Sequence, residues 1–296
     1  MIQIALLGAG GKMGCRLTDH LQSHPDYALH CVETGERGRA NLAARGIAPT
    51  PREVILPKAD VVILALPDRV LGKVAHEIIP LLKPGALVIT LDPAAAHAGE
   101  LPARPDISYF VSHPCHPSVF DCFQTEAEIN DFFGGTHARQ AIVCALMQGP
   151  EEHYALGEKI ARDFYAPVTR SHRVTVEQMA ILEPTMAETC GVAMLIELRE
   201  VMEEAIRRGV PREAAEDFMY GHIKVVLGIV FGHVGFPLSD GAKLIAGVGR
   251  EKLFQPDWRK LFDAQSVKQQ VDAIVRGEPS GKAVESRSST LAASDC

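Results

Sequence analysis

The first fourteen residues of the chain constrain its fold most strongly. Residues 2–7 form a nearly continuous apolar run, which is typical of a parallel β-strand that is covered on both faces. Four glycines occupy the next seven positions, namely Gly8, Gly10, Gly11 and Gly14. Bulky residues that suit a helix then resume. The stretch therefore predicts a buried strand, a tight glycine turn and the start of a helix.

A strand, turn and helix of this kind can bind the diphosphate of a dinucleotide. The first glycine permits the sharp turn, Gly10 or Gly11 lets the backbone approach the diphosphate, and the last glycine lets the helix pack closely on the strand. Free N–H groups at the helix N-terminus, around Lys12 and Met13, are donors for phosphate. The usual G-x-G-x-x-G spacing is met only approximately. On the motif alone, a glycine turn that binds nothing stays an alternative.

The next strand supports cofactor binding. The apolar segment 27–32 ends in Glu33, about 25 residues after the first glycine and near the spacing of the acid that holds the adenine ribose hydroxyls. A carboxylate at this position repels a 2′-phosphate and therefore favours NAD. Arg37 and Arg39 lie just beyond it and could neutralise such a phosphate, or lie in a solvated loop, so NADP stays an alternative.

Composition narrows the class of protein. With 296 residues, 47% hydrophobic and 23% charged, the chain is long enough for two globular domains. A formal net charge of −7 without a long basic run argues against a nucleic-acid partner. Seven cysteines without a paired C-x-x-C spacing suit a reducing compartment. The chain starts directly with a strand and shows no apolar run of about 18 residues. We therefore expect a cytoplasmic protein with no membrane segment.

Strand-like and helix-like segments alternate as far as Val174. The expected strands after the first two cover residues 59–66, 86–91, 107–112, 140–147 and 168–174. The clearest helices cover residues 70–82 and 151–164. This alternation predicts an α/β fold, in which residues 1–174 form a doubly wound parallel sheet that binds the dinucleotide.

The chain changes character at Thr175. Residues 175–208 form one long stretch of apolar periodicity, and the Gly-Val-Pro sequence at 209–211 ends it. Because so long a helix needs extensive partners, we expect residues 175–276 to form an all-helical domain for substrate binding and homodimerisation. Residues 277–296, rich in Ser, Gly and Ala, are predicted to be a disordered tail.

Three polar residues follow the ends of predicted strands. Asp68 lies where the carboxyl ends of strands form the ligand crevice, so we expect it near the cofactor, although capping the next helix is an equally good role. His113 and His116 are each followed by a proline, which holds their backbone extended at the sheet edge. Histidine can transfer protons or bind a metal. The alternative is a surface loop whose histidines make local hydrogen bonds.

Glu183 is the preferred catalytic acid or metal ligand of the long helix. It precedes Pro184, which removes a helical hydrogen bond and bends the axis. Glu177 and Glu188 share a face in an ideal α-helix, whereas Glu183 projects elsewhere. The alternative is that all three are solvated positions on a partly exposed helix.

Several segments resemble known families. Residues 8–14 and 59–68, together with an all-helical domain entered through one long helix, resemble the 6-phosphogluconate and β-hydroxyacid dehydrogenase superfamily, with ketol-acid reductoisomerase more distant. This resemblance implies a Rossmann domain at the N-terminus. More narrowly, four segments resemble the D-apionate oxidoisomerase group, namely residues 91–96, 112–117, 145–152 and 174–184. That group is implied to oxidise a branched sugar acid with NAD and to rearrange its carbon skeleton to 3-oxo-isoapionate.

The chain also departs from the wider superfamily. The serine-glycine-glycine substrate loop and the catalytic lysine of β-hydroxyacid dehydrogenases are absent, and the His113 and Glu183 regions stand in their places. If an acyl shift follows hydride transfer, a divalent cation would assist by polarising the carbonyl and alkoxide oxygens, as in the reductoisomerases. His113, His116 and Glu183 are the expected ligands, and Glu183 or His116 the expected base.

The prediction is therefore an NAD-dependent oxidoreductase of a small polyhydroxy acid that acts as a homodimer. One alternative is a 3-hydroxyacid or phosphogluconate-like dehydrogenase without isomerisation. Another is a protein that senses NAD without turnover. The polar residues on the long helix favour an enzyme.

Overall fold

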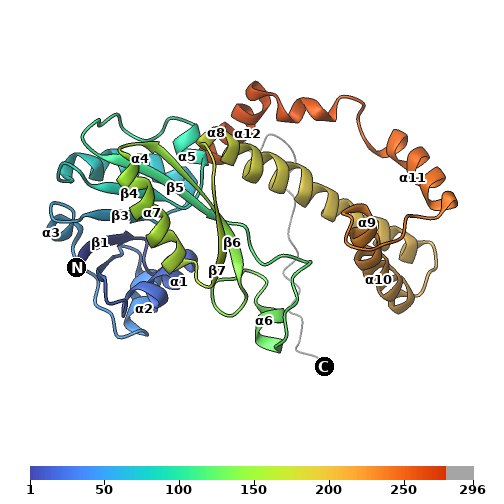
Figure 1. Cartoon of the computed structure of the whole chain (residues 1–296), viewed down its shortest axis with the longest axis horizontal. Coiled ribbons are helices and arrows are strands. Elements are labelled where there is room, and N and C mark those ends of the chain that lie inside the picture. Colours follow the sequence, from blue (N-terminus) through green and yellow to red (C-terminus); the bar gives the residue numbers. More distant parts are fainter. Residues whose placement is uncertain (278–296) are drawn as a thin grey trace.

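The computed structural model describes residues 1–277, and their first 173 residues form a seven-stranded sheet with helices on both faces (Figure 1). The spatial order is β2-β1-β3-β4-β5-β6-β7. The strands are β1 (Ile2–Leu7), β2 (Tyr27–Val32), β3 (Val61–Leu64), β4 (Leu87–Thr90), β5 (Ser108–Pro114), β6 (Gln140–Gln148) and β7 (Val168–Arg173). The predicted α/β fold is confirmed.

The prediction that all strands of the sheet run parallel is wrong at β6. The first five strands run parallel, but β6 pairs antiparallel with β5, and β7 then pairs parallel with β6. The reason lies in segment 115–139, which joins β5 to β6 and contains only the short helix α6 (Glu126–Asn130). A parallel neighbour needs a crossover connection over the sheet, usually a helix. This segment makes none, so the chain returns in the opposite direction.

Helices cover the two faces of the sheet separately. Because side chains alternate along a strand, Ile4 of β1 packs with helices α1 and α7, whereas Leu7 packs with α4. The helices of this domain are α1 (Lys12–Leu21), α2 (Glu36–Ala43), α3 (Arg52–Ile55), α4 (Asp68–Ile78) with the 3₁₀ turn η1 (Ile79–Leu81), α5 (Ala94–His97), α6 and α7 (Glu151–Phe164). Both faces of the central strands are therefore buried, as their apolar sequences require.

The predicted strand, glycine turn and helix are confirmed. Gly8 has φ +74°, a backbone conformation that favours glycine. A side chain at Gly14 would place its Cβ 2.0 Å from the carbonyl oxygen of Gly8. Helix α1 can therefore pack on β1 only because position 14 carries no side chain.

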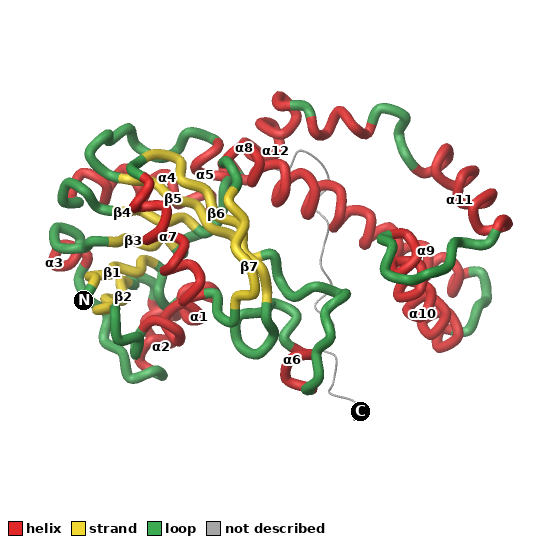
Figure 2. Tube along the Cα trace, in the orientation of Figure 1, coloured by secondary structure: helices red, strands yellow, loops and turns green. Residues whose placement is uncertain are grey.

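A single continuous helical rod leads away from the sheet. It consists of α8 (Val176–Ala180), a π-helical segment η2 (Ile181–Val192) and α9 (Ala193–Arg207). The chain continues through α10 (Arg212–Val230), α11 (Asp240–Leu253), the 3₁₀ turn η3 (Trp258–Phe262) and α12 (Ala264–Arg276). Figure 2 shows α10 folding back at the far end of the rod, while α12 returns to the sheet domain. There Val267 and Val271 pack with Ala94 and Ala180.

The rod tests the prediction that the chain contains no stretch apolar enough to span a membrane. By length and composition Val176–Arg207 is apolar enough to cross a membrane, with a mean hydropathy of 1.3 in its most apolar window, of which 22% is buried. The expectation of no such stretch is therefore corrected. At its N-terminal end the rod packs on the sheet domain, where Met179 is buried in the core and Ala180 packs with Ala94. Beyond Gly277, the predicted tail lies outside the described residues.

Candidate active site

A cavity of about 370 Å³ opens at the carboxyl edge of the parallel strands. Its walls come from the glycine turn, the ends of β3, β4 and β5, and residue Phe133 of the segment before β6. Six of the residues predicted from sequence line it, namely Gly11, Lys12, Met13, Asp68, His113 and His116. Tertiary structure thus gathers these six residues around one space, whereas Gly8, Gly10, Glu33 and Glu183 do not line it.

The glycine turn presents an uncapped helix N-terminus to this cavity. Gly11 is the N-cap residue of α1 and makes no side-chain cap, so the first N–H groups of the helix are available to an anion. Gly10 is required for packing instead, because a Cβ at this position would lie 2.0 Å from the carbonyl oxygen of Gly38 in α2. Of the two glycines considered for the diphosphate, Gly11 lines the cavity, and Gly10 allows α2 to approach the turn.

Glu33 stands at the end of β2 beside the turn. Its Oε2 accepts a hydrogen bond from the N–H of Gly10 at 3.0 Å, and its Oε1 accepts from the N–H groups of Thr34 and Gly35, each at 2.9 Å. The carboxylate therefore braces the glycine turn as well as placing a negative charge at the position expected for ribose recognition.

A metal-capable group includes two residues that line the cavity, Asp92 and His113. Asp92 follows β4, His113 belongs to β5 and Glu183 to η2, and one ligand atom from each lies within 4.8 Å of the others. Oxygen ligands of Ca²⁺ lie about 2.3–2.6 Å from the ion, so atoms this close can share one cation. Glu183 Oε2 is buried without a hydrogen-bond partner. An orphaned carboxylate oxygen of this kind suits a cation.

The protonation states of this group also suit a cation. Burial lowers the pKa of His113 to about 4, so the ring is neutral. Its Nδ1 donates to the carbonyl of Pro114 at 2.8 Å, which leaves the Nε2 lone pair free for a metal. Burial, and then the neighbouring carboxylates, raise the pKa values of Asp92 and Glu183. Ionising these two buried carboxyl groups costs free energy. A divalent cation would offset this cost, because it favours the charged carboxylates.

The metal-capable group differs in one residue from the predicted metal ligands His113, His116 and Glu183. His116 is not part of the group, and Asp92 takes its place. The His116 ring centroid lies 6.1 Å from that of His113, and His116 Nδ1 is bonded to the carbonyl of Phe133 at 2.9 Å. Asp92 carried the same signal as Asp68, a carboxylate directly after a buried parallel strand, and that signal could have identified it.

Glu188 is a further acid that the sequence reasoning misplaced. In an α-helix, residues five apart point in different directions, and Glu188 was expected on the face of Glu177. Residues 181–192 instead form a π-helix, whose larger turn brings positions five apart together. The carboxyl groups of Glu183 and Glu188 therefore contact each other, and this contact contributes to the raised pKa of Glu183 after burial and Asp92. π-helical turns are rare, and those found inside α-helices are frequently at functional sites.

Related proteins can be compared with this geometry. Residues 122–275 match the family described as phosphogluconate dehydrogenase (decarboxylating) C-term. A D-apionate oxidoisomerase from Cupriavidus necator is 45% identical over 273 residues, covering 92% of this chain and 99% of that protein. Another from Rhizobium rhizogenes is 45% identical over 275 residues, covering 93% of this chain and 100% of that protein.

Solved structures agree in fold. A semialdehyde dehydrogenase NAD-binding protein from Cupriavidus necator, crystallised in complex with calcium and NAD, matches with a TM-score of 0.90 and 45% identity, covering 93% of this chain and 99% of that chain. An NADH-preferring ketol-acid reductoisomerase from an uncultured archaeon has a TM-score of 0.69 at 19% identity, covering 94% and 87%, and shares the fold alone. By its sequence identity over nearly its whole length, the chain belongs to the D-apionate oxidoisomerase family.

Proposed function

We propose that this protein is an NAD-dependent D-apionate oxidoisomerase, which oxidises the branched sugar acid and rearranges it to 3-oxo-isoapionate. One observation carries the proposal. The first residues of helix α1 line the same cavity as Asp92 and His113, which form a metal-capable group with Glu183. The calcium and NAD bound by the Cupriavidus necator structure support the same pairing of ligands.

The cofactor half of the cavity orients the nucleotide. The N–H groups of Lys12 and Met13 would bind its diphosphate beside Gly11, whose own N–H donates to the carbonyl of Gly8, and Glu33 would accept hydrogen bonds from the ribose hydroxyls. Bound NAD supplies the acceptor for the hydride that leaves the substrate carbinol. Asp68 lies on the wall of the cavity, where burial raises the pKa of its carboxyl, and it would lie near the bound cofactor.

The substrate half holds charge and moves a proton. Asp92, His113 and Glu183 would hold a divalent cation, which would supply polarisation of the carbonyl and alkoxide oxygens for the acyl shift. His116 lines the same cavity with its Nε2 unoccupied by protein donors among residues 1–277, and this atom accepts the hydroxyl proton. His116 is the better choice of base, because Glu183 belongs to the cation group.

The test is turnover by the purified full-length protein. NADH formation is followed with D-apionate and with unbranched 3-hydroxy acids, with and without Mg²⁺ or Ca²⁺, and products are identified by mass and NMR. A rearranged product from D-apionate supports the proposal. Turnover of unbranched 3-hydroxy acids alone contradicts it in favour of a simple dehydrogenase. NAD binding without any turnover contradicts it in favour of a sensor.

The position of Glu33 predicts cofactor preference. We expect kcat/KM for NAD to exceed that for NADP by about a hundredfold, because the carboxylate repels a 2′-phosphate. Glu33→Gln keeps a hydrogen-bond acceptor for the turn but removes the charge, and should reduce the ratio to about tenfold. Glu36→Gln, which changes an exposed acid nearby on α2, is the control and should leave the ratio unchanged. An unchanged ratio in Glu33→Gln would contradict the assignment.

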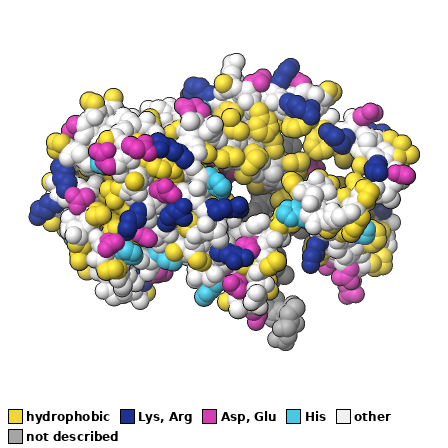
Figure 3. Space-filling model, viewed as in Figure 1, with side chains coloured by type: hydrophobic (Ala, Val, Ile, Leu, Met, Phe, Trp, Pro, Cys, Tyr) yellow, Lys and Arg dark blue, Asp and Glu magenta, His cyan; other side chains and the backbone are white. Residues whose placement is uncertain are grey.

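The far part of the helical domain supports a homodimer as the working form. In what we call the helical arm, residues 193–253, many large apolar side chains are more than half exposed, including Leu195, Phe218, Val230, Phe231, Leu244, Ile245 and Leu253. Figure 3 shows hydrophobic side chains gathered over the long helix. An arm of this length without a core of its own needs another surface, and a second copy supplies it. We place the dimer in the cytoplasm.

Sedimentation tests the dimer. The full-length protein should sediment as a dimer, and Leu244→Asp, at a side chain that is 69% exposed in one chain, should shift it toward monomer because the carboxylate would be buried in the interface. Val54→Asp, at a 53% exposed position on α3 of the sheet domain, is the matched control. A monomeric wild type, or equal effects of both substitutions, would sink the proposal.

A further inference from the structure

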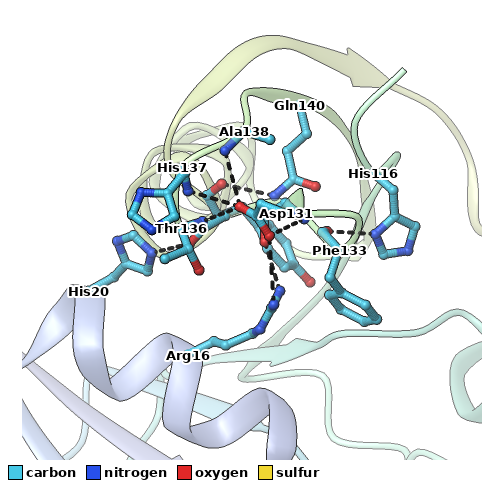
Figure 4. A network of polar contacts seen from close by, with 12 residues as sticks. Arg16, His20, His116, Asp131, Phe133, Thr136, His137, Ala138 and Gln140 are labelled. Carbon is cyan, nitrogen blue, oxygen red and sulfur yellow. Dashed lines mark hydrogen bonds and ion pairs between the residues drawn. The ribbon is translucent and has the colours of Figure 1, made fainter. Parts of the chain in front are cut away.

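Asp131, near the end of the segment that joins β5 to β6, holds together a tight turn at residues 131–138. Its side chain is only 7% exposed. Oδ1 accepts from the N–H of Gly134 at 3.0 Å, and Oδ2 accepts from the N–H groups of Thr136, His137 and Ala138 at 3.1, 2.8 and 3.1 Å. Figure 4 shows these hydrogen bonds converging on one carboxylate. This one side chain therefore accepts four of the hydrogen bonds that shape the turn.

The 131–138 turn is hydrogen-bonded to helix α1, whose N-terminus lines the cavity. Arg16 of α1 donates to the carbonyl of Gly134 at 2.7 Å, and His20 Nε2 is bonded to the carbonyl of Gly135 at 2.6 Å (Figure 4). The Phe133 ring lies against the cations of the same helix, 4.4 Å from the guanidinium of Arg16. These contacts hold Phe133 in the wall of the cavity.

The 131–138 turn is also hydrogen-bonded to His116, the proposed base. The carbonyl oxygen of Phe133 lies 2.9 Å from His116 Nδ1, and the two rings pack edge to face at 4.7 Å (Figure 4). A carbonyl oxygen only accepts hydrogen bonds, so Nδ1 carries the proton and Nε2 carries the lone pair. The contact therefore selects one tautomer of His116.

The backbone of His116 also has to be held in place. Its φ of +60° makes it the non-glycine residue with positive φ among residues 1–277. Such a conformation is unfavourable without glycine, and surrounding structure must maintain it. Cys115 precedes it with a backbone hydrogen bond to β6, and the Phe133 carbonyl bonds its side chain. The 131–138 turn is thus one of the two supports of this residue.

We propose that Asp131 is a positioning residue for the oxidation. It folds the 131–138 turn so that the Phe133 carbonyl holds His116 as the Nδ1–H tautomer, with Nε2 presented as the acceptor for a substrate hydroxyl. The inference rests on the proposed function for the identity of that hydroxyl, but the tautomer itself does not depend on any substrate.

The first experiment reads the tautomer directly. Protein with ¹⁵N-labelled histidine is studied by long-range ¹H–¹⁵N correlation, and the His116 signals are assigned by their loss in His116→Gln. We expect a protonated Nδ1 in the wild type and a mixture of tautomers in Asp131→Asn, whose amide cannot accept all four N–H groups. A Nδ1–H tautomer that persists unchanged in Asp131→Asn overturns the proposal. This readout stands even if D-apionate is not the substrate.

The second experiment asks whether Asp131 acts through His116. Asp131→Asn should lower kcat about tenfold or more and leave the Kd for NAD within about threefold, because the first N–H groups of α1 are untouched. In a His116→Gln background the same substitution should add less than about a twofold loss. Losses that multiply in the double variant overturn the proposal, as does full turnover by His116→Gln.

Controls separate positioning from loss of folding. Asp121→Asn removes the ion pair with Arg139 in the same segment without touching the turn, and it should keep the wild-type tautomer and kcat. Thermal unfolding of each variant is measured alongside. If Asp131→Asn does not fold, Asp131→Glu, which keeps the charge but displaces the acceptor oxygens, is expected to show the same mixed tautomer, and a wild-type tautomer there overturns the proposal.

Discussion

Replacing Glu183 by Gln is expected to lower kcat by about a thousandfold while NAD still binds with wild-type affinity. The amide keeps the size of the side chain but removes the negative charge from the group formed with Asp92 and His113. Without that charge the cation is held weakly, and the carbonyl and alkoxide oxygens lose their stabilisation. Gly11, Lys12 and Met13 line the cavity, whereas Glu183 does not, so cofactor affinity should not change.

Steady-state kinetics and titration of NAD by fluorescence measure the two effects separately. The matched control is Glu177→Gln, an exposed acid in the first turn of the same helical rod, which should retain at least half of the wild-type kcat. Wild-type turnover by Glu183→Gln would return this residue to a structural role. Equal losses from both substitutions would point to damage to the helix.

Adding a divalent cation to the metal-free protein should raise its melting temperature by about 5 °C or more at pH 8 and by less than about 2 °C at pH 5. The raised pKa values of Asp92 and Glu183 mean that the folded state binds their protons more tightly than the unfolded state. Their contribution to stability is therefore present below the unfolded pKa values near 4 and is lost as pH rises through the folded values. A cation offsets this loss, so its effect grows with pH.

His113 contributes with the opposite sign. Its pKa is lowered to about 4, so protonation of the unfolded state removes stability as pH falls below about 6.5. These two effects overlap between about pH 4 and 6.5. Two carboxyl groups outweigh one imidazole, so the group should make metal-free protein less stable as pH rises above about 4. Differential scanning fluorimetry with EDTA-treated protein and CaCl₂ measures the shifts, and His113→Gln is the control that should lose them. Equal shifts at both pH values, or a full shift in that variant, would exclude cation binding by this group.

The sequence by itself determined the nucleotide-binding half of the protein. The apolar run of β1, the turn at Gly8 and the close approach at Gly14 are local requirements, because each depends on residues adjacent in the chain. Alternation of apolar strands and helices was enough to predict the α/β class. Strand direction after β5 was not predictable in this way, because it depends on whether segment 115–139 crosses over the sheet.

Tertiary structure alone decided the composition of the candidate site. Asp92, His113 and Glu183 are separated by long stretches of chain and meet only because β4 and β5 are neighbours and the rod packs on their ends. The pairing of Glu183 with Glu188 depends on a π-helical register that an ideal α-helix does not have. The tautomer of His116 is set by a carbonyl 17 residues away. The periodicity of a sequence predicts which residues share a face of one helix or strand. The site combines residues from the ends of several strands and helices, so periodicity alone could not predict it.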